Sequence, residues 1–268
     1  MNLAICSLAS GSSGNCYVVC AGRQFVLVDA GISGKQIREG LASLGLSEEN
    51  LCGVFLTHSH SDHVKGLSVL MRRAKNAIVY ANEATLHGSG LSVPTERIRT
   101  FTTGETFFLE DLEVRTFPVS HDTEDPAGFT FRRGGRQLSI VTDTGVVTPA
   151  IAEQIRLADI LVLESNHDVN ILRMGPYPWF LKQRILSDRG HLSNEAAANA
   201  LAEALAQQLE LGEIPEKTVL LAHLSQENNF PQMAMATVSN ILEERGMLLA
   251  GVRIEVLSRT QPSDIYSI

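Results

Sequence analysis

The sequence has few of the features that mark membrane proteins, secreted disulfide scaffolds or proteins that coat nucleic acid. Its four cysteines lie in the first fifth of the chain without a zinc-ribbon spacing, so we expect buried thiols in a reducing compartment. No apolar run approaches the length of a membrane span, and Met1 to Leu8 show no signal-peptide pattern. The formal net charge of −8 argues against a surface that is basic all over. We therefore expect a cytoplasmic globular protein.

Three histidines and an aspartate are packed into the segment Thr57-His58-Ser59-His60-Ser61-Asp62-His63. The segment follows an apolar run, Val54 to Leu56, that is typical of a buried strand. Because alternate residues of an extended chain share a face, His58 and His60 should point to the same side. Asp62 and His63 follow where the chain turns into the next helix, so they can reach the same point. Imidazole and carboxylate groups are ligands for zinc-like ions, whereas ordinary surface histidines would explain so dense a cluster poorly.

Further polar residues stand where other apolar runs end. His121 follows the run ending at Val119, Asp143 follows the run ending at Thr142, and His223 follows the run ending at Ala222. Strand runs in both parts of the chain, each followed by helices, predict two sheets between layers of helices. We find no repeat and no linker, so we expect one domain spanning residues 1–268.

Local signals add detail to this outline. Ser33 and Ser193 each precede a helical pattern and are predicted N-caps. The segment Arg133 to Arg136, with two central glycines, predicts a β-hairpin turn. The prolines around Trp179 indicate a loop region.

The pattern His58-x-His60-x-Asp62-His63 resembles the signature of the metallo-β-lactamase-fold hydrolases. The resemblance implies an α+β fold, a four-layer αββα sandwich, with two divalent metal ions along one edge between the sheets. The implied ligands are His58, His60 and His121 for the first ion, Asp62, His63 and His223 for the second, and Asp143 as a bridge. Such ions would provide a metal-activated hydroxide and polarise the scissile phosphoryl or acyl group. Zinc suits the imidazole-rich set best, and manganese stays open.

Two other residues resemble the Glu–His pair of tRNase Z. Glu164 follows an apolar strand, and His191 lies in a Gly-His-Leu-Ser turn before a helix. The resemblance implies that His191 protonates the leaving group and that Glu164 orients it, so the expected catalytic residues are Asp62, Glu164 and His191. The alternative is that His191 only caps the start of the helix.

Candidate substrate contacts come from two polar loops. The segment Ser7 to Cys16 resembles the opening of the YycJ/WalJ-like hydrolases, which implies that Ser12, Ser13 and Asn15 lie near the substrate phosphate. Asn166 and His167 could contact a phosphate or only satisfy a turn. Three small basic clusters could be solvated surface or nucleic-acid contacts. The clusters are Arg72, Arg73 and Lys75; Arg132, Arg133 and Arg136; and Lys182, Arg184 and Arg189.

The later motifs, including Ser165 to Asp168 and Gly190 to Asn194, also resemble the YycJ/WalJ-like group. That group is associated with DNA repair and with exonuclease action from the 5′ end of duplex DNA. The resemblance therefore implies a phosphodiesterase or nuclease, most specifically a 5′–3′ exonuclease with DNA as its partner. The short segment between Asp143 and His191 leaves no room for the inserted domain of RNase J-type nucleases. Two alternatives stay open: a small-molecule hydrolase of a cyclic phosphodiester, thioester or lactone, and a non-catalytic binding protein that retains metal.

Overall fold

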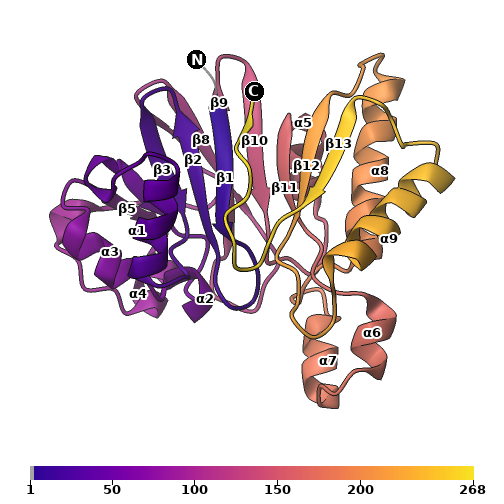
Figure 1. The fold of residues 1–268 in the computed structure, drawn as a ribbon, viewed down its shortest axis with the longest axis horizontal. Coiled ribbons are helices and arrows are strands. Elements are labelled where there is room, and N and C mark those ends of the chain that lie inside the picture. Colours follow the sequence, from indigo (N-terminus) through magenta and orange to yellow (C-terminus); the bar gives the residue numbers. More distant parts are fainter. Residues whose placement is uncertain (1–2) are drawn as a thin grey trace.

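Two mixed β-sheets pack face to face in the computed structural model, which describes residues 3–268 and gives each sheet seven strands in that range (Figure 1). The strands of the first sheet are, in spatial order, β14 (Tyr266–Ser267), β1 (Leu3–Ala9), β2 (Cys16–Ala21), β3 (Gln24–Val28), β4 (Gly53–Phe55), β5 (Ile78–Ala81) and β6 (Ile98–Thr100). Those of the second are β13 (Val252–Val256), β12 (Lys217–Ala222), β11 (Ile160–Glu164), β10 (Arg136–Val141), β9 (Ala127–Arg133), β8 (Leu112–Pro118) and β7 (Thr106–Leu109).

Helices cover the outer face of each sheet (Figure 1). The helices beside the first sheet are α1 (Gly34–Ser43), α3 (Leu67–Arg73) and α4 (Glu83–Ser89), with the short α2 (Ser61–Val64) at the lower edge and 3₁₀ turns at Glu48–Asn50 and Thr95–Arg97. Those beside the second sheet are α5 (Pro149–Leu157), α8 (Asn194–Glu210) and α9 (Pro231–Glu244). The remaining two, α6 (Val169–Met174) and α7 (Trp179–Ile185), form a hairpin that projects from the sandwich. Across residues 3–268, no helix has the length and apolar character needed to cross a membrane.

Three apolar clusters fill the spaces between these four layers. The middle cluster joins the two sheets and includes Ile5, Phe55, Phe129 and Val162. The cluster between the first sheet and its helices includes Leu27, Ile37, Leu41 and Leu70. The cluster between the second sheet and its helices includes Ile155, Leu163, Leu205 and Val238. Complete burial of such a side chain stabilises the fold by about 1.5–3 kcal/mol, so the layers are held by apolar packing on both faces of each sheet. The predicted αββα sandwich is confirmed, while the extent of a single domain over residues 1–268 stays a prediction.

The local predictions also agree with the structure. Ser33 caps α1 in a capping box: its side chain accepts the N–H of Gln36, and the Gln36 side chain accepts the N–H of Ser33. Ser193 caps α8 by accepting the N–H of Ala196. The turn between β9 and β10 has its two glycines at φ 58° and 81°, the left-handed region that such a two-residue hairpin requires.

The expected loop around Trp179 is wrong in part, because α6 and α7 lie on either side of a short connection that holds Pro176 and Pro178. Helix α6 begins where the Asp168 side chain accepts the N–H groups of Asn170 and Ile171. These helices have six and seven residues, too few for a helical period to show against the turn-like composition. Strands β6 and β14, with three and two residues, are likewise too short for the sequence pattern to predict them.

The carboxyl ends of the parallel strands place polar residues along one edge of the sandwich. In the first sheet β3, β4 and β5 run parallel, and in the second β10, β11, β12 and β13 do. The residues that end or follow these strands are Asp29, His58, Asp143, Glu164 and His223. Because both sheets present these ends at the same edge, side chains from distant parts of the chain can meet there.

Candidate metal centre and active site

The loop between β4 and α2 carries the first four candidate ligands. His58 and His63 are buried, whereas His60 and Asp62 are half-buried. Nε2 of His58 lies 3.1 Å from Nδ1 of His60, as expected for alternate residues of an extended segment. The loop fits closely against the strand-end turn after β3, because Gly31 there would place a Cβ only 1.6 Å from the Asp62 carbonyl oxygen. Only glycine allows this approach.

The remaining predicted ligands join this loop from three other segments. Ligand atoms of His58, His60 and His121 lie within 4.8 Å of one another, and so do those of Asp62, His63 and His223. Asp143 stands between the two groups. Its Oδ2 is 3.6 Å from Nε2 of His63, and its Oδ1 is 3.9 Å from Nε2 of His121. All seven side chains therefore gather in one cluster.

Three buried imidazoles of the cluster are held through Nδ1, and their Nε2 atoms are left to face the cluster. Nδ1 of His63 bonds to Asp29 at 2.7 Å, and Nδ1 of His223 bonds to Glu164 at 2.8 Å. Nδ1 of His121 lies 3.1 Å from the Gly190 carbonyl oxygen. Such partners set the tautomer and ring orientation of metal-binding histidines.

Two inward-facing atoms in the cluster are left without a hydrogen bond in the described part of the chain, Oδ2 of Asp143 and Nε2 of His223. Both are buried, and a buried polar atom without a partner is costly. Imidazole nitrogens and carboxylate oxygens at these separations are a donor set that a divalent transition-metal ion accepts. The cluster thus fits the metal that the sequence predicts.

The titratable groups of the cluster shift one another's pKa values. Burial opposes protonation of His63, but Asp143 and Asp29 outweigh it and raise the pKa of His63 to about 9. Burial and the imidazole of His63 lower the pKa of His58 well below its usual value. Although burial opposes ionisation of Asp62, the nearby His223 and His63 hold the pKa of that carboxyl well below its usual range. Protons held by His63 must leave when a metal binds, so binding should release protons.

Glu164 connects the metal cluster to His191. It is completely buried, and its Oε1 lies 2.8 Å from Nδ1 of both His191 and His223. Its Oε2 accepts the N–H groups of Thr144 and Leu192. Burial alone would raise the pKa of Glu164, yet His191 and His223 hold it well below its usual range. The Glu–His pair expected from the sequence is therefore formed, and it leaves Nε2 as the free nitrogen of His191.

A cavity of about 180 Å³ opens beside His191 and His121. Its other lining residues are Ser12, Asn166, Tyr177, Leu181, Arg184, Ile185, Gly190 and Ser225. Of the five predicted substrate contacts, Ser12 and Asn166 thus line the cavity. Ser13 is exposed outside it, and His167 is buried away from it.

Asn15 has a different position from the other predicted contacts. It is buried, its Nδ2 lies 3.1 Å from Nε2 of His63, and its backbone N–H donates to the Asp62 carbonyl. It also exchanges hydrogen bonds with Gly11. Asn15 therefore holds the loop between β4 and α2 against the turn formed by residues Ser10 to Asn15.

Sequence reasoning missed Asp122, Tyr177 and Ser225. Asp122 lies 3.3 Å from Nε2 of His121 and 3.6 Å from Nε2 of His60, and it forms an ion pair with Arg184. Its position directly after His121 was the only available signal. Tyr177 and Ser225 reach the cavity through tertiary packing, which no local pattern reveals.

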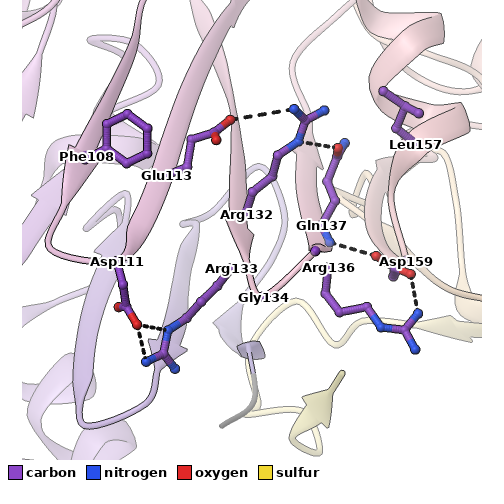
Figure 2. A pocket seen from close by; sticks show the side chains of 11 residues that line it. Phe108, Asp111, Glu113, Arg132, Arg133, Gly134, Arg136, Gln137, Leu157 and Asp159 are labelled. Atoms are coloured by element: carbon purple, nitrogen blue, oxygen red, sulfur yellow. Dashed lines mark hydrogen bonds and ion pairs between the residues drawn. The ribbon is translucent and has the colours of Figure 1, made fainter.

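Another hollow, of about 490 Å³, lies at the opposite end of β10 from Asp143, around the β9–β10 turn (Figure 2). Three arginines of a predicted basic cluster line it, and each has a carboxylate partner. The pairs are Arg132 with Glu113, Arg133 with Asp111, and Arg136 with Asp159. This hollow lacks the concentration of imidazoles found at the other edge, so the metal cluster is the better candidate for an active site.

Comparison with known proteins places this geometry in context. A family model described as beta-lactamase superfamily domain matches residues 24–211. The chain is 42% identical over 250 residues to the exodeoxyribonuclease YycJ of Bacillus anthracis, covering 92% of this chain and 91% of that protein. It is 40% identical over 242 residues to the exodeoxyribonuclease WalJ of Streptococcus pneumoniae, covering 88% and 87%. The solved metallo-beta-lactamase fold protein YhfI of Bacillus subtilis matches the full length of both chains (100% and 100%) with a TM-score of 0.73 at 15% identity, a likeness of fold.

Proposed function

Because this chain belongs to the beta-lactamase superfamily, we propose that it is a metal-dependent nuclease that removes nucleotides from the 5′ end of DNA. The observation that carries the proposal is the convergence of seven ligand-type side chains and the Glu164–His191 pair on one edge of the sandwich. The likeness to the two exodeoxyribonucleases supports DNA as the substrate, since it extends over most of this chain.

We assign two divalent ions to the cluster. His58, His60 and His121 would hold one, Asp62, His63 and His223 the other, and Asp143 both. When bound, such ions supply Lewis acidity that lowers the pKa of water and polarises a phosphoryl group. The predominance of imidazoles favours zinc, and manganese is the second candidate.

The residues of the chain then have distinct tasks. Asp29 and Glu164 hold the rings of His63 and His223 in the orientation that directs Nε2 into the cluster. Glu164 also holds Nδ1 of His191, which leaves Nε2 to donate a proton to the 3′-oxygen of the departing nucleotide. Ser12 and Asn166 supply polar groups at the cavity wall beside it.

The proposal is tested by the products of cleavage. Metal-loaded protein is incubated with duplex DNA labelled at the 5′ end in one sample and at the 3′ end in another. The 5′ label should appear at once as mononucleotide, whereas the 3′ label should remain on gradually shortened strands. Asp62→Ala should abolish both, and Glu210→Ala, which removes an exposed carboxylate at the end of α8, should change neither.

Other outcomes would select a different function. Intact DNA together with hydrolysis of a cyclic phosphodiester, thioester or lactone would replace the proposal with a small-molecule hydrolase. Metal binding without any turnover would favour a binding protein. Repeating the assay with zinc and with manganese identifies the working ion.

We also place the protein in the cytoplasm and in DNA repair. All four cysteines, Cys6, Cys16, Cys20 and Cys52, are free thiols, which fits a reducing compartment. Removal of nucleotides from a 5′ end would suit the repair of a damaged strand.

A further inference from the structure

The α6–α7 hairpin exposes three large apolar side chains at its tip. Met174 is 82% exposed, Trp179 64% and Phe180 72%. Met174 ends α6, and the two aromatic residues begin α7, so the connection between the helices brings them to the same end of the hairpin. Figure 1 shows this hairpin projecting below the second sheet, apart from the helices that cover the sandwich. We call Met174, Trp179 and Phe180 the hairpin tip.

The hairpin has a defined internal structure. The Lys182 side chain is buried, and its Nζ donates to the carbonyl oxygens of Arg173 and Gly175, at 2.7 Å each. Lys182 thereby ties α7 to the end of α6. Asp168 caps α6, and Leu172 is completely buried. Because these contacts hold the two helices together, the hairpin tip presents its apolar groups at a low cost in conformational entropy.

Other residues of the same hairpin reach the candidate active site. Tyr177, Leu181, Arg184 and Ile185 line the 180 Å³ cavity together with His191. A DNA end held in that cavity would therefore lie against the hairpin. The exposed apolar groups stand on this same element, outside the cavity.

The charge of this region favours a polyanion. The segment from residue 169 to residue 190 contains Arg173, Lys182, Arg184 and Arg189 but only one acidic residue, Asp188, whereas the whole chain has a net charge of −8. Lys182 is committed to the backbone of the hairpin, and Arg184 pairs with Asp122. Arg173 and Arg189 are both exposed. Arg173 lies beside Met174 at the tip, whereas Arg189, beyond the other end of α7, donates to the carbonyl oxygens of His121 and Thr123, so positive charge flanks both ends of α7.

We propose that the hairpin tip stacks against bases of the DNA strand next to the end held at the active site. The inference rests on the proposed nuclease function and adds to it a positioning surface outside the cavity. Aromatic faces stack on any base, so the tip would hold DNA without reading its sequence. It would keep the strand end in place while the reaction proceeds and would contribute to binding of DNA but not of small phosphodiesters.

Trp179 makes the test direct, because it is the only tryptophan in the chain. Metal-loaded wild-type protein is titrated with duplex DNA whose terminal linkages are phosphorothioates, which slows cleavage, and its tryptophan fluorescence is recorded. Stacking of a base on the indole should quench the emission with a saturable dependence on DNA concentration. Trp179→Ala and Phe180→Ala should each weaken DNA binding about tenfold in a polarisation assay with labelled DNA.

Three controls separate the possible causes. Leu211→Ala and Ile214→Ala remove exposed apolar side chains elsewhere and should leave DNA affinity unchanged. Hydrolysis of bis(p-nitrophenyl) phosphate by Trp179→Ala and Phe180→Ala should match the wild type, which would show that the variants are folded and retain metal. Sedimentation over a range of concentrations reports whether the tip joins two copies of the chain.

The inference is overturned if the tip variants bind DNA as tightly as the wild type, or if emission stays constant while DNA binds. It is also overturned if Trp179→Ala dissociates a dimer without changing DNA affinity, since the tip would then be a contact between copies. These results leave cleavage of DNA by the wild type unaffected, so they refute the inference and not the proposed function. Failure of the wild type to bind or cleave DNA refutes the proposed function itself, and the inference with it.

Discussion

Replacing His167 with leucine should make the protein more resistant to acid. His167 is 1% exposed, and within residues 3–268 neither of its ring nitrogens has a hydrogen-bond partner. Burial lowers the pKa of His167 to about 4 from its usual value near 6.5, an effect that Glu164 opposes and His191 reinforces. Asp168 opposes it more weakly. Between pH 6.5 and pH 4 the folded protein therefore binds fewer protons at this residue than the unfolded chain, so stability is lost as the pH falls through that window.

The size of the effect follows from these two pKa values. For a single site, linkage gives a loss of roughly 2 kcal/mol at pH 5 relative to pH 8, approaching roughly 3 kcal/mol near pH 4. Leucine does not titrate, and its introduction removes no hydrogen bond made by the imidazole. Between pH 8 and pH 5 the His167→Leu variant should thus lose roughly 2 kcal/mol less unfolding free energy than the wild type.

Urea denaturation of both metal-loaded proteins at pH 8 and pH 5 measures this difference. Acid weakens metal binding in both proteins, and that contribution cancels in the comparison. Equal losses in the two proteins would refute the assignment of acid sensitivity to His167. DNA cleavage at pH 8 should survive in His167→Leu, and its loss would restore the alternative in which His167 contacts the phosphate.

Three further changes test the metal site and its supports. Asp29→Ala removes the carboxylate that holds Nδ1 of His63 at 2.7 Å. Metal affinity, measured by competition with a chelator, should therefore fall by about 10–100-fold. An unchanged affinity would mean that other contacts hold the ring of His63. Gly31→Ala places a Cβ 1.6 Å from the Asp62 carbonyl oxygen, so it should displace the loop between β4 and α2 and lower both the melting temperature and the metal content. The control Gly45→Ala meets no atom within 4 Å and should reduce the unfolding free energy by only about 1–2 kcal/mol, because of its positive φ. His191→Ala should lower kcat by about 10²–10⁴-fold with metal content unchanged, whereas His223→Ala should lose metal. If both variants lose metal, His191 is a metal ligand rather than a general acid.

The clustering of the candidate ligands could be predicted from sequence because these residues combine a dense local motif with strand ends. His58, His60, Asp62 and His63 stand within a single loop, and the isolated His121 becomes informative only beside that motif. The four layers were predictable for a related reason, since long apolar runs that alternate with amphipathic helices leave few ways to bury both faces of two sheets. Short elements carry no such period, and the α6–α7 hairpin therefore remained hidden.

Basic residues were harder to interpret than histidines. Lys182 was grouped with Arg184 and Arg189 as a possible nucleic-acid contact, but its ammonium group is buried against two backbone carbonyls. A charged residue in a sequence gives no sign of whether a carbonyl, a carboxylate or solvent will surround it. The role of such a residue depends on how its helix is positioned in the fold, which is set by packing far from it in sequence.

Three residues at the candidate metal site share a backbone conformation that no sequence pattern reveals. Asp29, Asp143 and His223 have φ of 61°, 57° and 56°, in the left-handed region that costs a non-glycine residue about 1–2 kcal/mol. Each stands just beyond the carboxyl end of a strand, where the left-handed turn breaks the alternation of faces. Glycine would relieve the strain, but it would remove the carboxylate or imidazole that the cluster needs. The surrounding fold must therefore hold these positions, as when the N–H of Asp29 bonds to the Phe55 carbonyl and that of His223 bonds to Ser10 Oγ. Glu110 and Asp125, at φ 52° and 50°, share this region elsewhere in the described chain. At the candidate metal site such strain is expected where a site is stabilised by its ligand more than by its own backbone, so metal binding should stabilise this edge more than the rest of the sandwich.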